Sequence, residues 1–135
     1  MANDKNSTSL ASEFYVASIL WRLGFEVSIT MGHTKEIDLF TRKGSSYAMI
    51  DVKGARQPPF LIQTRETYGD HSFYIFVLWQ RSFENVNKTP RCFIVPAVDI
   101  PKVWSDIPRW GNQSKAVKLK ELNDYESKWE YLEKK

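Results

Sequence analysis

Two short apolar stretches that each carry an acid decide the fold: Ile37-Asp38-Leu39 and, after a polar break, Met49-Ile50-Asp51-Val52-Lys53-Gly54. Residues i and i+2 of a β-strand point to the same face of a sheet. Asp51 and Lys53 should therefore stand side by side while their apolar neighbours pack behind them. Acids and lysines are rarely buried unless they are paired or bound to a metal, so this arrangement indicates a catalytic centre.

Composition sets the limits for the rest of the chain. Its 135 residues are enough for one domain with a core, and the formal net charge of +3 is compatible with a polyanionic partner without requiring one. The single cysteine, Cys92, excludes an internal disulfide framework and a Cys-rich zinc site. The two histidines, His33 and His71, are too few for a zinc site built on His. An intracellular, cytoplasmic location is expected.

The N-terminal region is polar and carries no apolar run of the kind found in signal peptides. We expect residues 1–8 to be a disordered lead-in and residues 9–135 to form a single domain. No stretch approaches the roughly 18 uninterrupted apolar residues that a membrane span needs. The sequence therefore predicts a soluble protein without a membrane partner.

A first helix is predicted from Leu10 to Leu23, with Ser9 as N-cap and Gly24 ending it. Its expected apolar face contains Leu10, Phe14, Ala17, Leu20 and Trp21, with Glu13 in the middle. A carboxylate on an apolar face needs a partner. The simpler alternative is that Glu13 stays solvated near the positive end of the helix dipole.

Alternating or continuous apolar residues predict five strands: Phe25–Met31, Glu36–Thr41, Tyr47–Lys53, Phe73–Trp79 and Arg91–Val95. Periodicity leaves 60–68 undecided between a short helix and a loop, and a helical turn is expected within 96–104. Residues 121–133 repeat apolar side chains at helical spacing and predict a last helix. This order predicts an α/β fold with a mixed central sheet of about five strands flanked by helices.

The clustered acids fit a divalent metal. Mg²⁺ prefers carboxylate and carbonyl oxygens and usually takes one or two protein carboxylates. Asp38 and Asp51 can supply the carboxylates and the Val52 backbone carbonyl a further oxygen, while Glu13 would bind directly or through water. Such a metal makes hydroxide available near neutral pH and neutralises charge that builds up on a phosphate. Lys53 can orient the water or stabilise the developing charge.

The ordered set Glu13, Ile37-Asp38 and Asp51-Val52-Lys53 resembles the PD-(D/E)xK nuclease superfamily, which has the restriction-endonuclease-like fold and includes small Holliday junction resolvase-like nucleases. The resemblance covers residues 10–54. It implies a restriction-endonuclease-like core and Mg²⁺- or Mn²⁺-dependent hydrolysis of phosphodiester bonds. Ile37 replaces the proline of the motif, a change that removes no ligand. The second half, residues 55–135, leaves the substrate open.

Further polar residues are candidates for nucleic-acid binding. In this superfamily the element after the Lys strand often contacts phosphate, which points to Arg56, Gln63 and Arg65. Lys35 flanks the Asp38 strand, as do Arg42 and Lys43, although turn solubility explains these three equally well. A solvated surface loop explains the basic stretch 109–120 better than a binding strip does. Four tryptophans could stack on bases, but core packing explains most of them better: Trp79, Trp104, Trp110 and Trp129.

The leading hypothesis is a small metal-dependent endonuclease that acts on DNA. Glu13, Asp38, Asp51 and Lys53 form its catalytic set. A homodimer is expected because two active sites would serve the two strands of a duplex or junction. The alternative is a non-catalytic nucleic-acid-binding or protein-interaction module that retains the nuclease fold.

Overall fold

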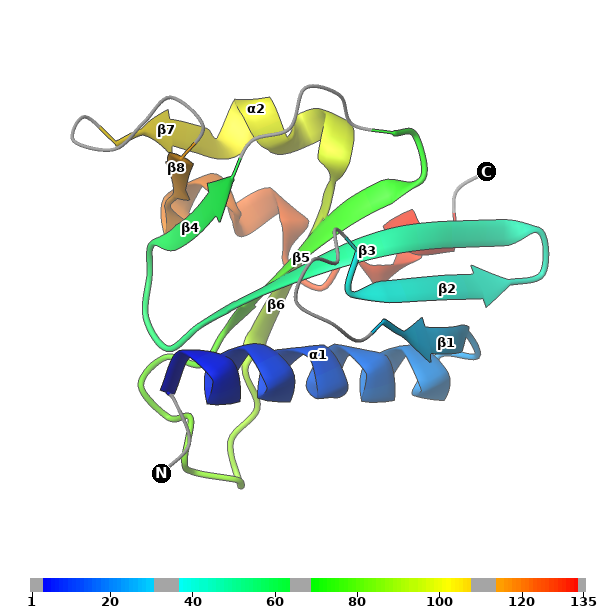
Figure 1. The fold of residues 1–135 in the computed structure, drawn as a ribbon, viewed down its shortest axis with the longest axis horizontal. Coiled ribbons are helices and arrows are strands. Elements are labelled where there is room, and N and C mark those ends of the chain that lie inside the picture. Colours follow the sequence, from blue (N-terminus) through cyan, green and yellow to red (C-terminus); the bar gives the residue numbers. More distant parts are fainter. Residues whose placement is uncertain (1–3, 31–36, 64–68, 108–113, 134–135) are drawn as a thin grey trace.

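The computed structural model describes residues 4–30, 37–63, 69–107 and 114–133 (Figure 1). Its centre is a five-stranded sheet in the order β1-β2-β3-β5-β6. Only the β3–β5 pair is parallel, so the sheet is mixed, as predicted. The strands are β1 (Glu26–Ile29), β2 (Leu39–Lys43), β3 (Ser46–Ala55), β5 (Ser72–Leu78) and β6 (Arg91–Pro96).

Helix α1 (Asp4–Arg22) packs on one face of this sheet and begins earlier than the predicted Leu10. Thr8, expected in a disordered lead-in, is helical and only 7% exposed. Its backbone carbonyl accepts a hydrogen bond from Ser12 Oγ at 2.7 Å, and its hydroxyl accepts one from Arg56 Nε at 2.9 Å. These contacts hold the first turns against the sheet, where local sequence gave no helix signal. No helix among the described residues is long and apolar enough to cross a membrane.

The buried face of α1 also differs from the prediction. Leu10, Phe14 and Trp21 are 47%, 55% and 57% exposed, so they point away from the sheet. The helix instead buries a face that includes Glu13 and Val16 together with Ala17 and Leu20. The apolar residues of α1 extend around both sides of the helix, and the sequence alone did not show which side the sheet would cover. The consequence is that Glu13 lies inside the fold.

A second sheet covers the β5 and β6 half of the other face. It is formed by β4 (Phe60–Gln63), β8 (Ser114–Val117) and β7 (Trp104–Asp106). With η1 (Ala97–Asp99) and α2 (Ile100–Val103) it builds a core cluster against β5 and β6. The helical turn expected within 96–104 is confirmed. The reading of 109–120 as a surface loop is wrong for 114–117, which form the central strand of this sheet.

The predicted C-terminal helix is wrong. The chain forms three short 3₁₀ segments instead: η2 (Leu119–Glu121), η3 (Asn123–Tyr125) and η4 (Trp129–Glu133). Ser127 has a φ of 57°, and its backbone N–H donates to the Cys92 carbonyl at 2.9 Å. Glu126 forms an isolated antiparallel bridge with Phe93 of β6. Pairing with this edge strand therefore replaces one helical turn. The apolar residues of the expected stripe still dock, because Leu122 and Leu132 are both buried.

Near this bridge, Arg91 and Glu126 form a two-pronged ion pair with N···O distances of 2.9 and 2.8 Å. The hydrogen bond from Arg91 lowers the pKa of Glu126 below its ordinary value. A carboxyl whose pKa is depressed by folding stabilises the protein above its unfolded pKa of about 4.3, and this stabilisation is lost as the pH falls through the folded pKa.

Glu126→Gln should therefore lower the free energy of unfolding at pH 7 by no more than about 1 kcal/mol, because the pair is partly solvated. The difference from wild type should vanish below the folded pKa. Urea unfolding of both proteins at a series of pH values from 7 downward measures this. A difference that stays constant throughout the acid range would mean that the ion pair is not its source.

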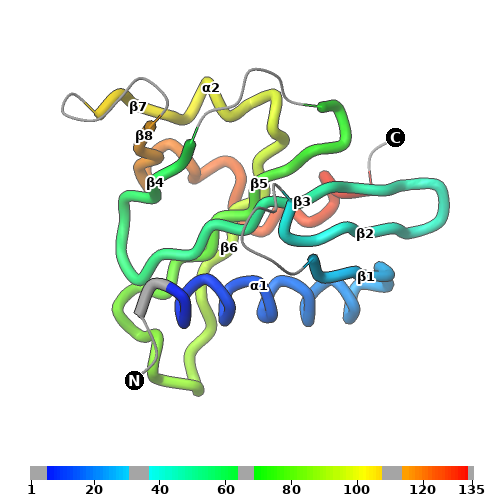
Figure 2. The backbone as a smooth tube through the Cα atoms, viewed as in Figure 1, coloured from blue at the N-terminus to red at the C-terminus, as the bar shows by residue number. Residues whose placement is uncertain are grey.

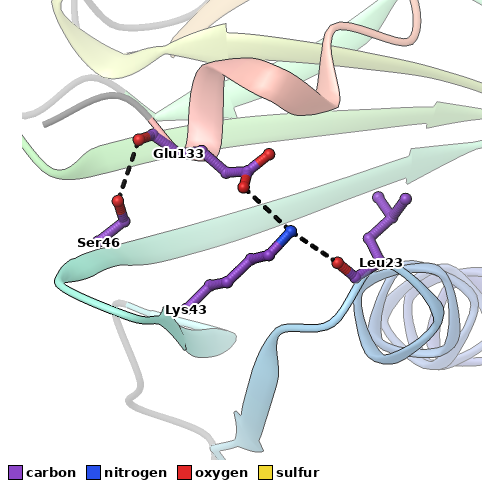
Figure 3. Close-up of polar contacts among 4 residues, drawn as sticks. All are labelled: Leu23, Lys43, Ser46 and Glu133. Atoms are coloured by element: carbon purple, nitrogen blue, oxygen red, sulfur yellow. Dashed lines mark hydrogen bonds and ion pairs between the residues drawn. The ribbon is translucent and has the colours of Figure 1, made fainter.

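The C-terminal segment η4 returns to β3, the second strand of the β2–β3 hairpin (Figure 2). Lys43 Nζ donates to the Leu23 carbonyl at 2.9 Å and pairs with the Glu133 carboxylate at 3.0 Å (Figure 3). Ser46 Oγ donates to the Glu133 carbonyl at 3.0 Å. Lys43, considered above for nucleic-acid contact, thus joins the end of α1, the hairpin and the C-terminal segment.

Candidate functional site

Strand β3 places Asp51 and Lys53 on the same face of the main sheet. Lys53 Nζ lies 3.4 Å from Asp51 Oδ1, and the two side chains are 34% and 11% exposed. The alternate residues Ile50 and Val52 are buried in the core on the α1 side. The alternation read from the sequence therefore produces a polar pair backed by apolar packing.

Asp38 immediately precedes β2 and is tied to β3 by two hydrogen bonds. Its carboxylate Oδ2 accepts from the Val52 backbone N–H at 2.7 Å, and its own N–H donates to the Ile50 carbonyl at 2.9 Å. Both partners flank Asp51 in the sequence. The two acids thus belong to neighbouring strands and are joined through the backbone that carries the second one.

Glu13 reaches the interior from α1 and is 6% exposed. The solvated alternative considered for this carboxylate is therefore wrong. The helix can approach the sheet closely because Gly54 has no side chain: a Cβ there would lie 2.0 Å from Ser12 Oγ. The Trp79 indole N–H also donates to Ser12 Oγ, at 3.0 Å.

Ser12 and Gly54 are positioning residues that the sequence reading missed. Each is the chain neighbour of a proposed site residue, because Ser12 precedes Glu13 and Gly54 follows Lys53. A glycine within a strand, as Gly54 is in β3, often marks a close backbone approach. That signal was available, but only the structure identifies the helix residue on the other side of the contact.

The donor set suits a hard divalent cation. Asp38 and Asp51 offer carboxylate oxygens on adjacent strands, and Mg²⁺ typically takes one or two carboxylates and several waters. Within the described residues, no group of three or more His, Cys, Asp or Glu side chains could hold a metal. Cys92 is buried, which raises the pKa of its thiol to about 12.

The predicted nucleic-acid contacts are scattered. Arg56 bonds to Thr8, and its guanidinium lies 4.2 Å from the Phe83 ring centroid, so it has a structural position behind the site. Gln63 is exposed on β4, where its Nε2 donates to Ser114 Oγ at 3.0 Å. Lys35 and Arg65 lie outside the described residues, as do His33 and Trp110. Arg42 is exposed and pairs with Glu26 at 3.1 Å.

Three of the four tryptophans considered for base stacking are described. Trp79 is 9% exposed, while Trp104 and Trp129 pack partly buried against the two core clusters. This favours the packing explanation for all three. His71 is half-buried beside β3 and stacks on Tyr47.

Comparison with family models and with curated protein sequences finds no match. Solved structures are similar in fold. Hjc, a Holliday junction resolvase from Archaeoglobus fulgidus, superposes with a TM-score of 0.64 at 13% identity over 94% of this chain and 97% of its own. A bacterial homing endonuclease gives 0.58 at 14% identity over 97% of this chain and 91% of its own. The chain therefore shares the fold of these two proteins, which agrees with the restriction-endonuclease-like core expected from the sequence.

Proposed function

We propose that this protein is a metal-dependent endonuclease that hydrolyses phosphodiester bonds in DNA. One observation carries the proposal: an Asp–Lys pair at 3.4 Å stands on a sheet face whose neighbouring strand holds Asp38, bonded to the same strand backbone. In a fold shared with a Holliday junction resolvase and a homing endonuclease, this is the chemistry that phosphodiester hydrolysis needs.

Each proposed site residue has a task. Asp38 and Asp51 would hold Mg²⁺ or Mn²⁺, with the Val52 carbonyl as a further oxygen, and Glu13 would support the site through water, because no group of three carboxylates among the described residues could hold the metal. When bound, the metal supplies a Lewis acid that polarises the phosphate and lowers the pKa of water. The Lys53 ammonium stabilises the negative charge that develops on the phosphate or orients the attacking water.

The proposal includes DNA as the substrate, a homodimer as the assembly and the cytoplasm as the location. The two neighbours' names suggest DNA as the substrate, and the net charge of +3 is compatible with it. A homodimer stays a prediction from the short chain and the two strands of the substrate. A single cysteine, buried and without a partner thiol in the chain, suits a reducing cytoplasm.

The direct test is cleavage of labelled DNA by the purified protein. The panel contains linear duplex, single-stranded, flap and four-way-junction DNA, each with Mg²⁺, Mn²⁺ or EDTA. We expect cutting of at least one substrate with either metal and none with EDTA. Magnesium restored after EDTA treatment should restore the activity, which separates metal removal from denaturation.

Absence of cutting across the whole panel would contradict the proposal. If the protein then bound DNA equally well with metal and with EDTA, the alternative of a non-catalytic binding module would hold. The proposal would likewise fail if the cutting persisted in EDTA, since a metal-independent nuclease does not need the paired acids.

A further inference from the structure

An exposed group of rings lies on the same sheet face as the Asp51–Lys53 pair. The Tyr47 and His71 rings stack with centroids 4.0 Å apart and an interplanar angle of 21°. Phe40 continues the stack, 6.2 Å from Tyr47 at 27°. Phe40 and Tyr47 are each 41% exposed. We refer to Phe40, Tyr47 and His71 as the aromatic shelf.

Strand register fixes where the aromatic shelf lies. Tyr47 and Asp51 are both odd-numbered residues of β3, so they share a face, and they are separated by about 13 Å at about 3.3 Å per residue. Phe40 pairs with Met49, the residue midway between them, and therefore belongs to the same face. The Met49 N–H donates to the His71 carbonyl at 2.9 Å, which holds His71 beside the strand.

Core packing does not account for these rings. One core cluster lies on the α1 side of the sheet, and the other lies under the second sheet, which covers β5 and β6. Neither cluster contains Phe40 or Tyr47. Figure 1 shows the second sheet at the opposite end of the molecule from the β2–β3 hairpin that carries them. Among the described residues, neither core cluster covers the β1–β3 half of this face, and the Asp51–Lys53 pair lies next to the covered half.

We propose that the aromatic shelf binds unpaired bases of the nucleic acid whose backbone crosses the Asp51–Lys53 pair. Exposed rings stack on bases regardless of sequence, and only unstacked bases offer a free face. A separation of about 13 Å corresponds to about four stacked nucleotides, or fewer in an extended strand. Arg42, the cross-strand neighbour of Tyr47, is exposed on the same face and can contact the phosphate of a nucleotide bound on the shelf.

This inference rests on the proposed function, which places cleavage at the Asp51–Lys53 pair. It adds a prediction of the class of DNA that is cut. DNA with unpaired nucleotides within a few positions of the cut, such as a flap or a distorted junction, is preferred over uninterrupted duplex. A second copy of the chain or another protein docking on the shelf is the competing outcome. Continuity with the Asp51–Lys53 pair favours nucleic acid.

Binding can be measured apart from cleavage. Fluorescence anisotropy in EDTA compares a labelled single-stranded oligonucleotide with the duplex of the same sequence. Tyr47→Leu, which keeps an apolar side chain in the strand, should weaken single-strand binding about tenfold and change duplex binding little. Tyr47→Phe keeps the ring and should bind like wild type. Phe14→Ala removes a ring that is 55% exposed on α1, on the other side of the sheet, and should also bind like wild type.

Wild-type single-strand affinity in Tyr47→Leu would overturn the proposal, as would an equal loss in Phe14→Ala. A change in molar mass by light scattering in Tyr47→Leu, without a change in DNA binding, would assign the shelf to protein contact. The two proposals can fail separately. Ring-dependent binding without any cleavage would support base binding by the shelf and contradict the nuclease proposal. Metal-dependent cleavage that is insensitive to Tyr47→Leu would support the nuclease and contradict base binding by the shelf.

Discussion

Asp51→Asn is expected to reduce metal-dependent DNA cleavage about 10³-fold. Asparagine keeps the size and one oxygen of the side chain but removes the charge that faces Lys53 at 3.4 Å and that would hold the metal. A metal contributes several kcal/mol of transition-state stabilisation, and each 1.4 kcal/mol corresponds to about a factor of ten in rate. Single-turnover cleavage of the best substrate in the panel measures the loss.

The chain offers a matched control for this substitution. Asp106 on β7 forms a second Asp–Lys ion pair, with Lys115 on β8, and its side chain is 82% exposed. Asp106→Asn should change cleavage by no more than about twofold, as expected for an exposed surface site. Thermal unfolding of both variants checks that they remain folded. A folded Asp51→Asn that cuts like wild type would remove Asp51 from the mechanism and would point to a contaminating nuclease.

The five-stranded sheet could be predicted because its strands carry their own signal. Each has alternating or continuous apolar residues within a short segment, and β2 and β3 are joined by a polar turn at Gly44, whose φ is 60°. The second sheet carried no such signal. Strand β7 has three residues and β4 has four. The central strand β8 pairs with β4, which is distant in the sequence, so that Val117 of β8 lies opposite Phe60 of β4. Such short strands are stabilised by partners that no local pattern identifies.

The proposed site also has one part that local sequence predicts and one part that depends on contacts between distant residues. The Asp51–Lys53 pair depends on neighbouring residues of one strand, so alternation alone predicts it. The burial of Glu13 depends on which side of α1 meets the sheet. Apolar residues lie on both sides of that helix, so its periodicity gave the wrong face. The deciding contact, Ser12 against Gly54, joins residues far apart in the sequence.

Gly54→Ala is expected to lower the free energy of unfolding by about 3 kcal/mol or more, which is the upper end of the usual cost of overpacking a core. The added Cβ would lie 2.0 Å from Ser12 Oγ, 2.8 Å from Ser12 Cβ and 3.2 Å from the Thr8 carbonyl. Ser12 cannot simply turn away, because its hydroxyl donates to Thr8 and accepts from Trp79. The helix must move instead, and Glu13 moves with it. Urea unfolding measures the stability, and cleavage should fall even where the variant is folded.

Gly69→Ala is the control for adding a methyl group to a glycine. Among the described residues, a Cβ at Gly69 would meet only Ser72 Oγ at 3.4 Å, an ordinary contact, so the change in stability should stay within about 0.5 kcal/mol. The double variant Ser12→Gly/Gly54→Ala removes both Ser12 contacts, which are the two shortest, and keeps the contact with the Thr8 carbonyl. Its loss should be smaller than the sum of the two single losses, because residues in contact are coupled. Additive losses would mean that the helix does not rest on Gly54, and the position of Glu13 would then need another cause.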